Sequence, residues 1–302
     1  MKTHIILLLT ALLPAPTAWS QNTAMDPLCS SRLSIVLTGT VNGRPGATEK
    51  EQLIDDLLAE DAFVEHFSRF INASFNDQPG ETPEADAPYY LSSHVLKNDL
   101  PWNQIFSGPF IVARDGDTTV VRDDPEGLGY FRSPAWRERY AGNEGQGILL
   151  SMAYRMLQNV LGLVTKAADV PAEVDASDKG REAAGCRSCH FDAWFALDRT
   201  ASVLGRVRDG RNDRKVFDPP SGDVQKVLGA FEAKDDRDLV RIMLESEHYR
   251  FNTCSLIFRF LYGRDVVGRE GPVFDQCMAE FKASGKIRPA IKTMVSDPSY
   301  CG

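Results

Sequence analysis

The sequence lacks an apolar run long enough to cross a bilayer. The apolar stretch near its start, residues 5–13, falls well short of the roughly 18–20 residues that a spanning helix needs. A lysine precedes this stretch and the small residues of Ala18-Trp19-Ser20 follow it, which is the pattern of a secretory signal peptide cleaved between Ser20 and Gln21. We therefore expect residues 1–20 to be a signal peptide, with a membrane anchor as the alternative. The mature protein is expected to be exported, into the periplasm, with no membrane span.

Positive charge is also scarce. The chain has 34 Lys and Arg residues against 42 Asp and Glu, which gives a formal net charge of −8. Loss of Lys2 with the signal peptide leaves 33 positive against 42 negative groups, or −9. This balance argues against binding to nucleic acid or anionic lipid, because both attract basic protein surfaces. It suits a basic protein partner, although most acidic surfaces are simply solvated.

Strand-like alternation over a convincing length is nearly absent, and no internal repeat is visible. Apolar residues instead recur three and four positions apart, which is typical of amphipathic helices. Two such stretches follow one another, the first with Leu53, Ile54, Leu57 and Leu58 and the second with Phe63, Phe67, Phe70, Ile71 and Phe75. We therefore expect a mainly α fold.

The remainder of the N-terminal half fits the same class. Residues 77–88 contain three prolines and several acids, which predicts a surface loop. Residues 107–145 are expected to be irregular, with one small hairpin around the strand-like run 118–121. Helices are expected at 89–97 and at 147–163. Another helix is expected to start after Asp99, with Asp99 as its N-cap and Pro101 in its first turn.

One motif carries specific chemistry. Cys186-Arg187-Ser188-Cys189-His190 follows a short polar helix that is expected at 177–185. A covalent c-type haem needs two thiols at one edge of the porphyrin and an imidazole that reaches the iron from the same side. The motif supplies both, so we predict one covalent haem c held by Cys186 and Cys189, with His190 as the proximal ligand of the haem iron. Export agrees with this prediction, because haem is attached covalently outside the cytoplasm.

The sequence offers little for the competing interpretations of this motif. A structural zinc site needs four ligands, usually from a second Cys-x-x-Cys or a His pair, and the chain has no second such pair. A thioredoxin-like dithiol would follow a strand in a βαβ unit, whereas a polar helix precedes Cys186. A disulfide within the motif or a metal site stays as the alternative.

The sixth iron ligand decides the chemistry of a haem protein. Methionine or histidine in that position gives a low-spin electron carrier, and an open position permits reaction with peroxide or small ligands. Met152, on the helix before the motif, and Met243, at a separation compatible with a small cytochrome c domain, are the leading candidates for the distal ligand. His248 is third, with a surface histidine as the ordinary interpretation. We interpret His66 and His94 as ordinary helix residues.

The residues that follow the motif suit a haem pocket. Trp194 and Phe195 are expected to wall the haem, which is a special case of core packing. Arg206 and Arg208 are candidates for pairing with the propionates, because a guanidinium matches the geometry of a carboxylate. Solvent-exposed arginines are an equally good interpretation of the same two residues.

Segments along most of the mature chain resemble one known family. Cys186–His190, followed by Phe195-Ala196-Leu197 and Gly205-Arg206, is similar to the haem segment of the planctomycete-type cytochrome C proteins. Other similar segments are 32–39, 53–58, 99–106, 254–264 and 294–300. Only the haem motif is specific, and many relatives are far longer, with domains that this chain lacks. The resemblance implies a mainly helical, exported haem protein. It also gives weak support to Met152, because relatives sometimes carry a candidate iron ligand at the corresponding position. It names no substrate, because the activity of the family is largely unassigned.

These features suggest how the chain is divided. The mature length of about 280 residues suits one large domain or two ordinary ones. We expect a helical N-terminal domain at 21–166 and a cytochrome c-like haem-binding domain at 167–302, with a linker in 167–173.

Four cysteines lie outside the motif. Export would place the chain in an oxidising compartment, where Cys29, Cys254, Cys277 and Cys301 allow three disulfide pairings. Consecutive antiparallel helices would bring Cys254 near Cys277, and Cys29 and Cys301 could then join the termini. The sequence leaves the pairing open.

Three functions are compatible with the sequence. The first is an exported monohaem c-type cytochrome that transfers electrons to and from a redox protein partner. The second is a haem peroxidase or oxidase with an open distal site, for which the sequence places no distal acid–base group. The third is a structural or binding component of an exported complex, which the large N-terminal half without the motif suggests.

Overall fold

The computed structural model describes residues 25–41, 49–142, 145–165, 175, 177–211 and 215–301. The predicted signal peptide at 1–20 and the predicted linker at 167–173 both lie outside the described residues. Helices account for 61% of the described structure, so the predicted mainly α class is confirmed. Within the described ranges, no helix is both long and apolar enough to span a membrane.

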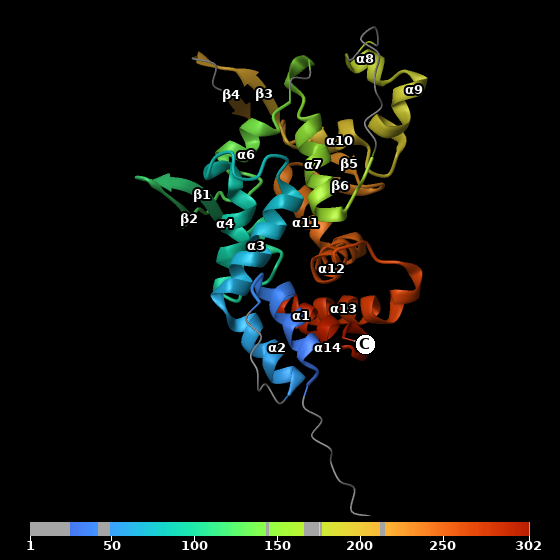
Figure 1. Cartoon of the computed structure of the whole chain (residues 1–302). Coiled ribbons are helices and arrows are strands. Elements are labelled where there is room, and N and C mark those ends of the chain that lie inside the picture. Colours follow the sequence, from blue (N-terminus) through green and yellow to red (C-terminus); the bar gives the residue numbers. More distant parts are fainter. Residues whose placement is uncertain are drawn as a thin grey trace, which may run out of the picture.

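The lower part of the molecule in Figure 1 is built from both ends of the chain. Its N-terminal helices are α1 (Pro27–Thr38) and α2 (Lys50–Ala59), and α3 (Asp61–Phe75) and α4 (Ala87–Lys97) lie above them at mid-height. Its C-terminal helices are α12 (Glu247–Tyr262), α13 (Gly271–Ser284) and α14 (Ile287–Ser296). Helix α14 packs against both α2 and α12, so segments far apart in the sequence lie side by side.

Among the described residues, the upper part contains shorter helices and three antiparallel hairpins. The helices are α5 (Gln104–Ser107), α6 (Pro134–Arg139), α7 (Leu150–Leu161), α8 (Asp178–Arg181), α9 (Ala184–Arg187), α10 (Leu197–Ser202) and α11 (Asp236–Glu245). The hairpins are β1 (Phe110–Asp115) with β2 (Thr118–Asp123), β3 (Arg206–Asp209) with β4 (Lys215–Asp218), and β5 (Gln225–Val227) with β6 (Phe231–Ala233). The first hairpin confirms the one predicted around 118–121, and the other two were not anticipated.

Aromatic residues of α3 form the centre of the lower core. Phe63, Phe67 and Ile71 are fully buried, as their helical spacing predicts. The Phe67 ring lies 4.9 Å from the ring of Phe260 on α12 and 5.9 Å from that of Trp102, both edge to face. The amphipathic pattern of 63–75 therefore predicted this helix correctly, and the structure adds that it packs against α12.

Contacts between the two halves cross the predicted domain boundary. Lys292 of α14 pairs with Asp55 of α2 at 2.6 Å, and Arg288 donates to the Leu58 carbonyl oxygen at 2.9 Å. One hydrophobic core includes buried residues from both sides of residue 166. The division at 166/167 lies outside the described residues and stays a prediction, while the helices on its two sides share a core.

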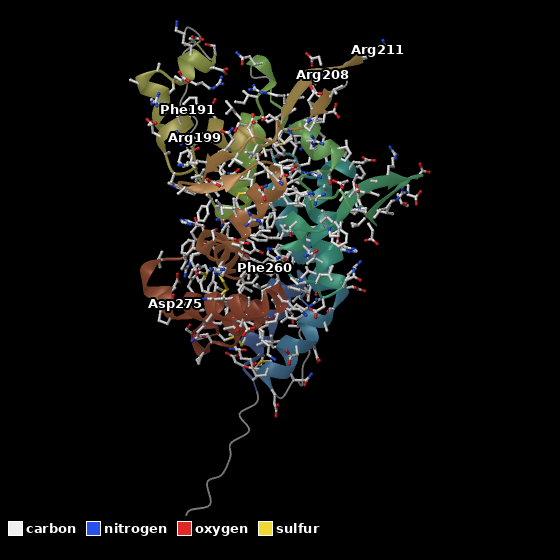
Figure 2. The ribbon with its side chains drawn as sticks, turned by 180° about the vertical axis from the view of Figure 1, so that it is seen from behind. Phe191, Arg199, Arg208, Arg211, Phe260 and Asp275 are labelled. Carbon is white, nitrogen blue, oxygen red and sulfur yellow. A yellow bond between two sulfur atoms is a disulfide. The ribbon has the colours of Figure 1, made fainter. Side chains whose placement is uncertain are left out.

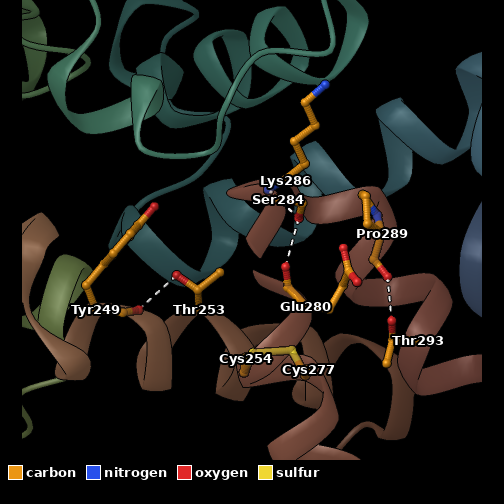
Figure 3. The surroundings of a disulfide bond; sticks show 9 residues. All are labelled: Tyr249, Thr253, Cys254, Cys277, Glu280, Ser284, Lys286, Pro289 and Thr293. Carbon is orange, nitrogen blue, oxygen red and sulfur yellow. Dashed lines mark hydrogen bonds between the residues drawn. A yellow bond between two sulfur atoms is a disulfide. The ribbon is translucent and has the colours of Figure 1, made fainter. Parts of the chain in front are cut away.

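Two disulfides reinforce this arrangement. Cys29 and Cys301 are joined with their Cα atoms 5.2 Å apart, and Cys254 and Cys277 are joined at 6.0 Å. Figure 3 shows the second bond between α12 and α13, beside the hydrogen bond that the Thr253 hydroxyl donates to the Tyr249 carbonyl oxygen. Of the three pairings that the sequence left open, the structure contains the one that the helical hairpin favoured.

The helix predicted to start after Asp99 is wrong in its boundary. Helix α5 begins at Gln104, and Asp99 has a φ of +50° with its carboxylate paired to Lys286. The chain turns at Asp99 so that the Trp102 side chain enters the core, where it is 1% exposed. The backbone N–H of Trp102 donates to the Gly285 carbonyl oxygen at 2.8 Å. Burial of this large side chain therefore overrides the local capping pattern.

Gly205 joins α10 to β3, and we expect its replacement by alanine to destabilise the protein strongly. Its φ is +88°, and a Cβ there would lie 2.1 Å from the Asp218 carbonyl oxygen. Gly222 has a similar φ of +81° but open space around it. In urea unfolding, Gly205→Ala should lower the free energy of unfolding by about 3 kcal/mol or more, and Gly222→Ala by about 1–2 kcal/mol. If the two variants lose equal free energy of unfolding, the β3–β4 hairpin must move away from the new Cβ at position 205 without an energetic cost.

Candidate functional site

The motif lies on a short helical segment at the end of the molecule opposite α14 (Figure 1). Cys186 is in α9, and Cys189 and His190 lie in the π-helical turn η3 (Ser188–Asp192) that continues it. Residues three and four apart lie on the same face of a helical segment. The Ala193 N–H donates to the Ser188 carbonyl oxygen at 2.7 Å, which closes the wider turn. Such turns are frequent at functional sites because they redirect side chains.

Both cysteines of the motif are free thiols. Cys186 is half-buried and Cys189 is exposed, whereas Cys29, Cys254, Cys277 and Cys301 are all joined in disulfides. The thiol pair is therefore not used for cross-linking within the described part of the chain. It is accessible to a reagent or cofactor from solvent.

His190 is held by a buried carboxylate. Its Nδ1 lies 2.6 Å from Oδ2 of Asp198, whose side chain is 7% exposed. A carboxylate at this distance accepts from Nδ1–H, which in the neutral imidazole places the lone pair on Nε2. This tautomer is the one in which Nε2 can bind a metal ion, and it is fixed by the hydrogen bond of the other ring nitrogen.

A buried arginine holds the carboxylate in turn. Arg181 of α8 donates from Nε to Oδ1 of Asp198 at 2.9 Å, and its other end pairs with Asp178. Burial acts to lower the pKa of Arg181, but hydrogen bonds and negative charge from Asp198 and Asp178 outweigh burial and raise it. Arg181 therefore stays charged, and each oxygen of Asp198 has a donor.

A strained turn and a packed helix position Asp198. Ala196 has a φ of +32° and sits directly before α10, whose first turn contains Asp198. The Thr200 hydroxyl donates to the Phe195 carbonyl oxygen at 2.7 Å, which fixes this turn from the other side. Helix α10 packs against α7, and its Ala201 is fully buried. The carboxylate is therefore anchored to the core, although the motif itself is mostly exposed.

An aromatic surface adjoins the motif. Trp194 is 43% exposed and stacks on His248 of α12, with ring centroids 5.3 Å apart and planes at 20°. Phe195 is buried and meets Trp194 edge to face at 5.7 Å. Figure 2 shows Phe191 and Arg199 close together in this region. Trp194 and Phe195 are thus adjacent to the motif, as expected of haem-wall residues, and their contact with haem stays a prediction.

The two methionines predicted as distal ligands lie in the core. Met152 of α7 is 4% exposed and Met243 of α11 is 0% exposed. Their assignment as iron ligands stays a prediction. His248 is exposed and stacks on Trp194, so it lies beside the motif, and its role as a third candidate ligand stays a prediction.

Two other histidines behave as ordinary helix residues, which was their interpretation from the sequence. His66 lies on α3 with its ring 5.4 Å from that of Phe260, and His94 lies on α4 with its ring 4.7 Å from that of Phe110. Burial lowers the pKa of both imidazoles. Both are packed against aromatic rings of other elements.

The arginines proposed for the propionates lie on β3. The Arg206 guanidinium is exposed and donates to the Gln146 carbonyl oxygen at 3.3 Å. Arg208 pairs with Asp218 at 2.9 Å, and Figure 2 shows it on the other side of the upper part of the molecule from Phe191. The structure therefore does not bring Arg208 to the motif, and a role for Arg206 stays a prediction.

Sequence reasoning missed Asp198 and Arg181. Both have ordinary surface-residue character in the sequence, and only their burial marks them as unusual. One signal was available: Asp198 directly follows the apolar stretch Phe195-Ala196-Leu197, at the start of a helix. A charged residue in that position merited consideration as a partner for His190.

Comparison with known proteins adds no assignment. No protein-family model, curated protein or solved structure matches this chain. The resemblance to the planctomycete-type cytochrome C proteins therefore stays a prediction.

The donor set fits a covalent haem. Two free thiols and an imidazole whose Nε2 carries the lone pair share one helical segment, which is what covalent attachment and proximal ligation require. A structural zinc ion would need about four convergent ligands. In the part of the chain that the structure describes, no group of three or more His, Cys, Asp or Glu side chains converges in this way.

Proposed function

We propose that this chain is an exported monohaem c-type cytochrome that transfers electrons to and from a redox protein partner. The observation that carries the proposal is the His190–Asp198 hydrogen bond beside two free thiols. It leaves Nε2 of His190 as a basic ligand on the segment that presents Cys186 and Cys189. The region around the motif would then be the cytochrome c-like part of the chain.

The residues of the motif divide the work of holding the cofactor. Each thiol would add its S–H across a vinyl group, which forms a thioether and needs no leaving group. His190 would bind the iron through Nε2, with Asp198 keeping the ring in the required tautomer. A haem bound in this way supplies a one-electron couple. Trp194 and Phe195 would exclude water from one side of it.

Charge and exposure support a role in electron transfer. The mature chain would carry a net charge near −9, which favours a basic partner. The motif segment is largely exposed and lies at one end of the molecule, where a partner can approach it. Electron transfer needs close approach to the haem edge, and this placement permits it.

A second function is favoured by one observation. Met152 and Met243 are both buried in the core, so neither sulfur lies on the surface beside the motif. If both stay there in the haem protein, the distal position is open or is taken by another side chain, such as the exposed His248. An open position would support a peroxidase- or oxidase-type reaction instead of electron transfer alone.

An absorption spectrum tests the proposal and separates these functions. The protein would be produced with its leader in cells that mature cytochromes c, then examined oxidised, reduced, and reduced with carbon monoxide. Sharp reduced bands that ignore carbon monoxide are expected for a six-coordinate carrier. A shift on addition of carbon monoxide would support the open-site enzyme. Absence of any covalent haem would overturn the proposal and restore the disulfide or metal interpretation of the motif.

A further inference from the structure

His190 donates its hydrogen bond to an unusually strong acceptor, the carboxylate of Asp198. Asp198 accepts at 2.6 Å, and its side chain is 7% exposed. A hydrogen bond to an ionised acceptor is stronger than one to a neutral carbonyl oxygen. Exclusion of water strengthens it further, because the local dielectric constant is lower. Asp198 therefore draws the Nδ1 proton toward itself and increases electron density on the imidazole ring.

Electron density on the ring changes what Nε2 does to a bound metal ion. Partners of the outer ring nitrogen raise the basicity of a histidine ligand. A more basic axial ligand stabilises ferric over ferrous iron, and hydrogen bonding to the axial ligand is one of the ways in which proteins tune haem potential. The carboxylate therefore acts on iron through His190.

Arg181 fixes the orientation of the Asp198 carboxylate, and its positive charge offsets part of the negative charge that acts on His190. Its Nε donates to Oδ1, the oxygen that His190 does not use. Its side chain is 6% exposed, so the pair is desolvated together. Both partners are anchored, Arg181 on α8 and Asp198 on α10, which holds Oδ2 toward the ring of His190 on the intervening turn.

We propose that Asp198 is a positioning residue that orients His190 and lowers the reduction potential of the haem, so that the ferric state is favoured. The inference rests on the proposed haem function. It goes beyond that function because it assigns control of the reduction potential to Asp198, a buried residue that belongs to neither the motif nor the haem wall.

The test compares Asp198→Asn with Asp192→Asn in the full-length haem protein. Asp192 lies two residues after His190, is 54% exposed and pairs with Arg187, so it controls for loss of one negative charge near the motif. At a fixed ambient potential, Asp198→Asn should raise the ferrous-to-ferric ratio about tenfold or more, which is about 59 mV for a one-electron couple. Asp192→Asn should change it less than about threefold, because exposed charges are screened.

The sign of the shift separates tuning from damage. Loosening of the site would let water reach the haem and favour the ferric state, whereas loss of the carboxylate favours the ferrous state. An unchanged ratio, or a shift toward ferric iron, in Asp198→Asn would overturn the inference. If that variant yields no haem protein, Asp198→Glu is measured instead: retention of the wild-type ratio supports the inference, and a tenfold shift toward ferrous iron with the carboxylate retained contradicts it. Absence of covalent haem from the wild-type protein would mean failure of the proposed function itself.

Discussion

Replacing both Cys186 and Cys189 by serine is expected to abolish covalent haem attachment. No other described cysteine can substitute, because the remaining four are joined in disulfides. Haem staining after denaturing electrophoresis should fall to background in Cys186→Ser/Cys189→Ser. Each single variant should retain at most one thioether and a small fraction of the wild-type signal.

Ser188→Ala provides the matched control. Ser188 lies between the two cysteines and is exposed, and its replacement leaves both thiols and His190 in place. It should keep wild-type haem content. Persistent covalent haem in the double serine variant would exclude thioether attachment at this motif. Loss of haem in Ser188→Ala as well would show that the segment fails to form, so that the result in the double variant would not report on the thiols.

Replacing Cys29 and Cys301 by alanine should lower the free energy of unfolding more than replacing Cys254 and Cys277. The first disulfide joins residues 272 apart in the sequence, and the second joins residues 23 apart. A disulfide restricts the unfolded chain more when it closes a longer loop. This model gives an expected loss of about 5.6 kcal/mol for the first pair and about 3.4 kcal/mol for the second, measured by urea unfolding without reductant.

The comparison between the two disulfide variants contains its own control. Cys254 and Cys277 are both 0% exposed, so their replacement also disturbs packing between α12 and α13. If the second variant loses more stability than the first, packing around the bond dominates over loop closure. Peptide mapping of the unreduced wild-type protein checks the pairing directly. A peptide linking Cys29 to Cys254 would contradict it.

Helices with a clear apolar face were predictable from local sequence. The spacing of Leu53 to Leu58 and of Phe63 to Phe75 correctly identified α2 and α3, because one buried face per helix imposes that spacing. The helix predicted at 147–163 was also found, as α7, with its C-cap at Gly162 in the left-handed conformation.

Short elements were less predictable because distant contacts form them. The β3–β4 and β5–β6 hairpins have four and three residues per strand, too few for a recognisable alternation. The start of α5 was misplaced because burial of Trp102 overrides the capping signal at Asp99. Such elements depend on what packs against them more than on their own residues.

The sequence by itself determined which reactive groups the motif presents, and their use in holding haem stays a prediction. Two cysteines and a histidine at that spacing need only one helical segment to present thiols and imidazole together, so the prediction requires no knowledge of the remaining fold. The tertiary structure decided what surrounds His190. Asp198 reaches Nδ1 because the chain turns at Ala196 and α10 packs on α7, and Arg181 reaches Asp198 from another helix. Burial converts these two ordinary charged residues into a pair that acts on the ring, and burial depends on the whole fold.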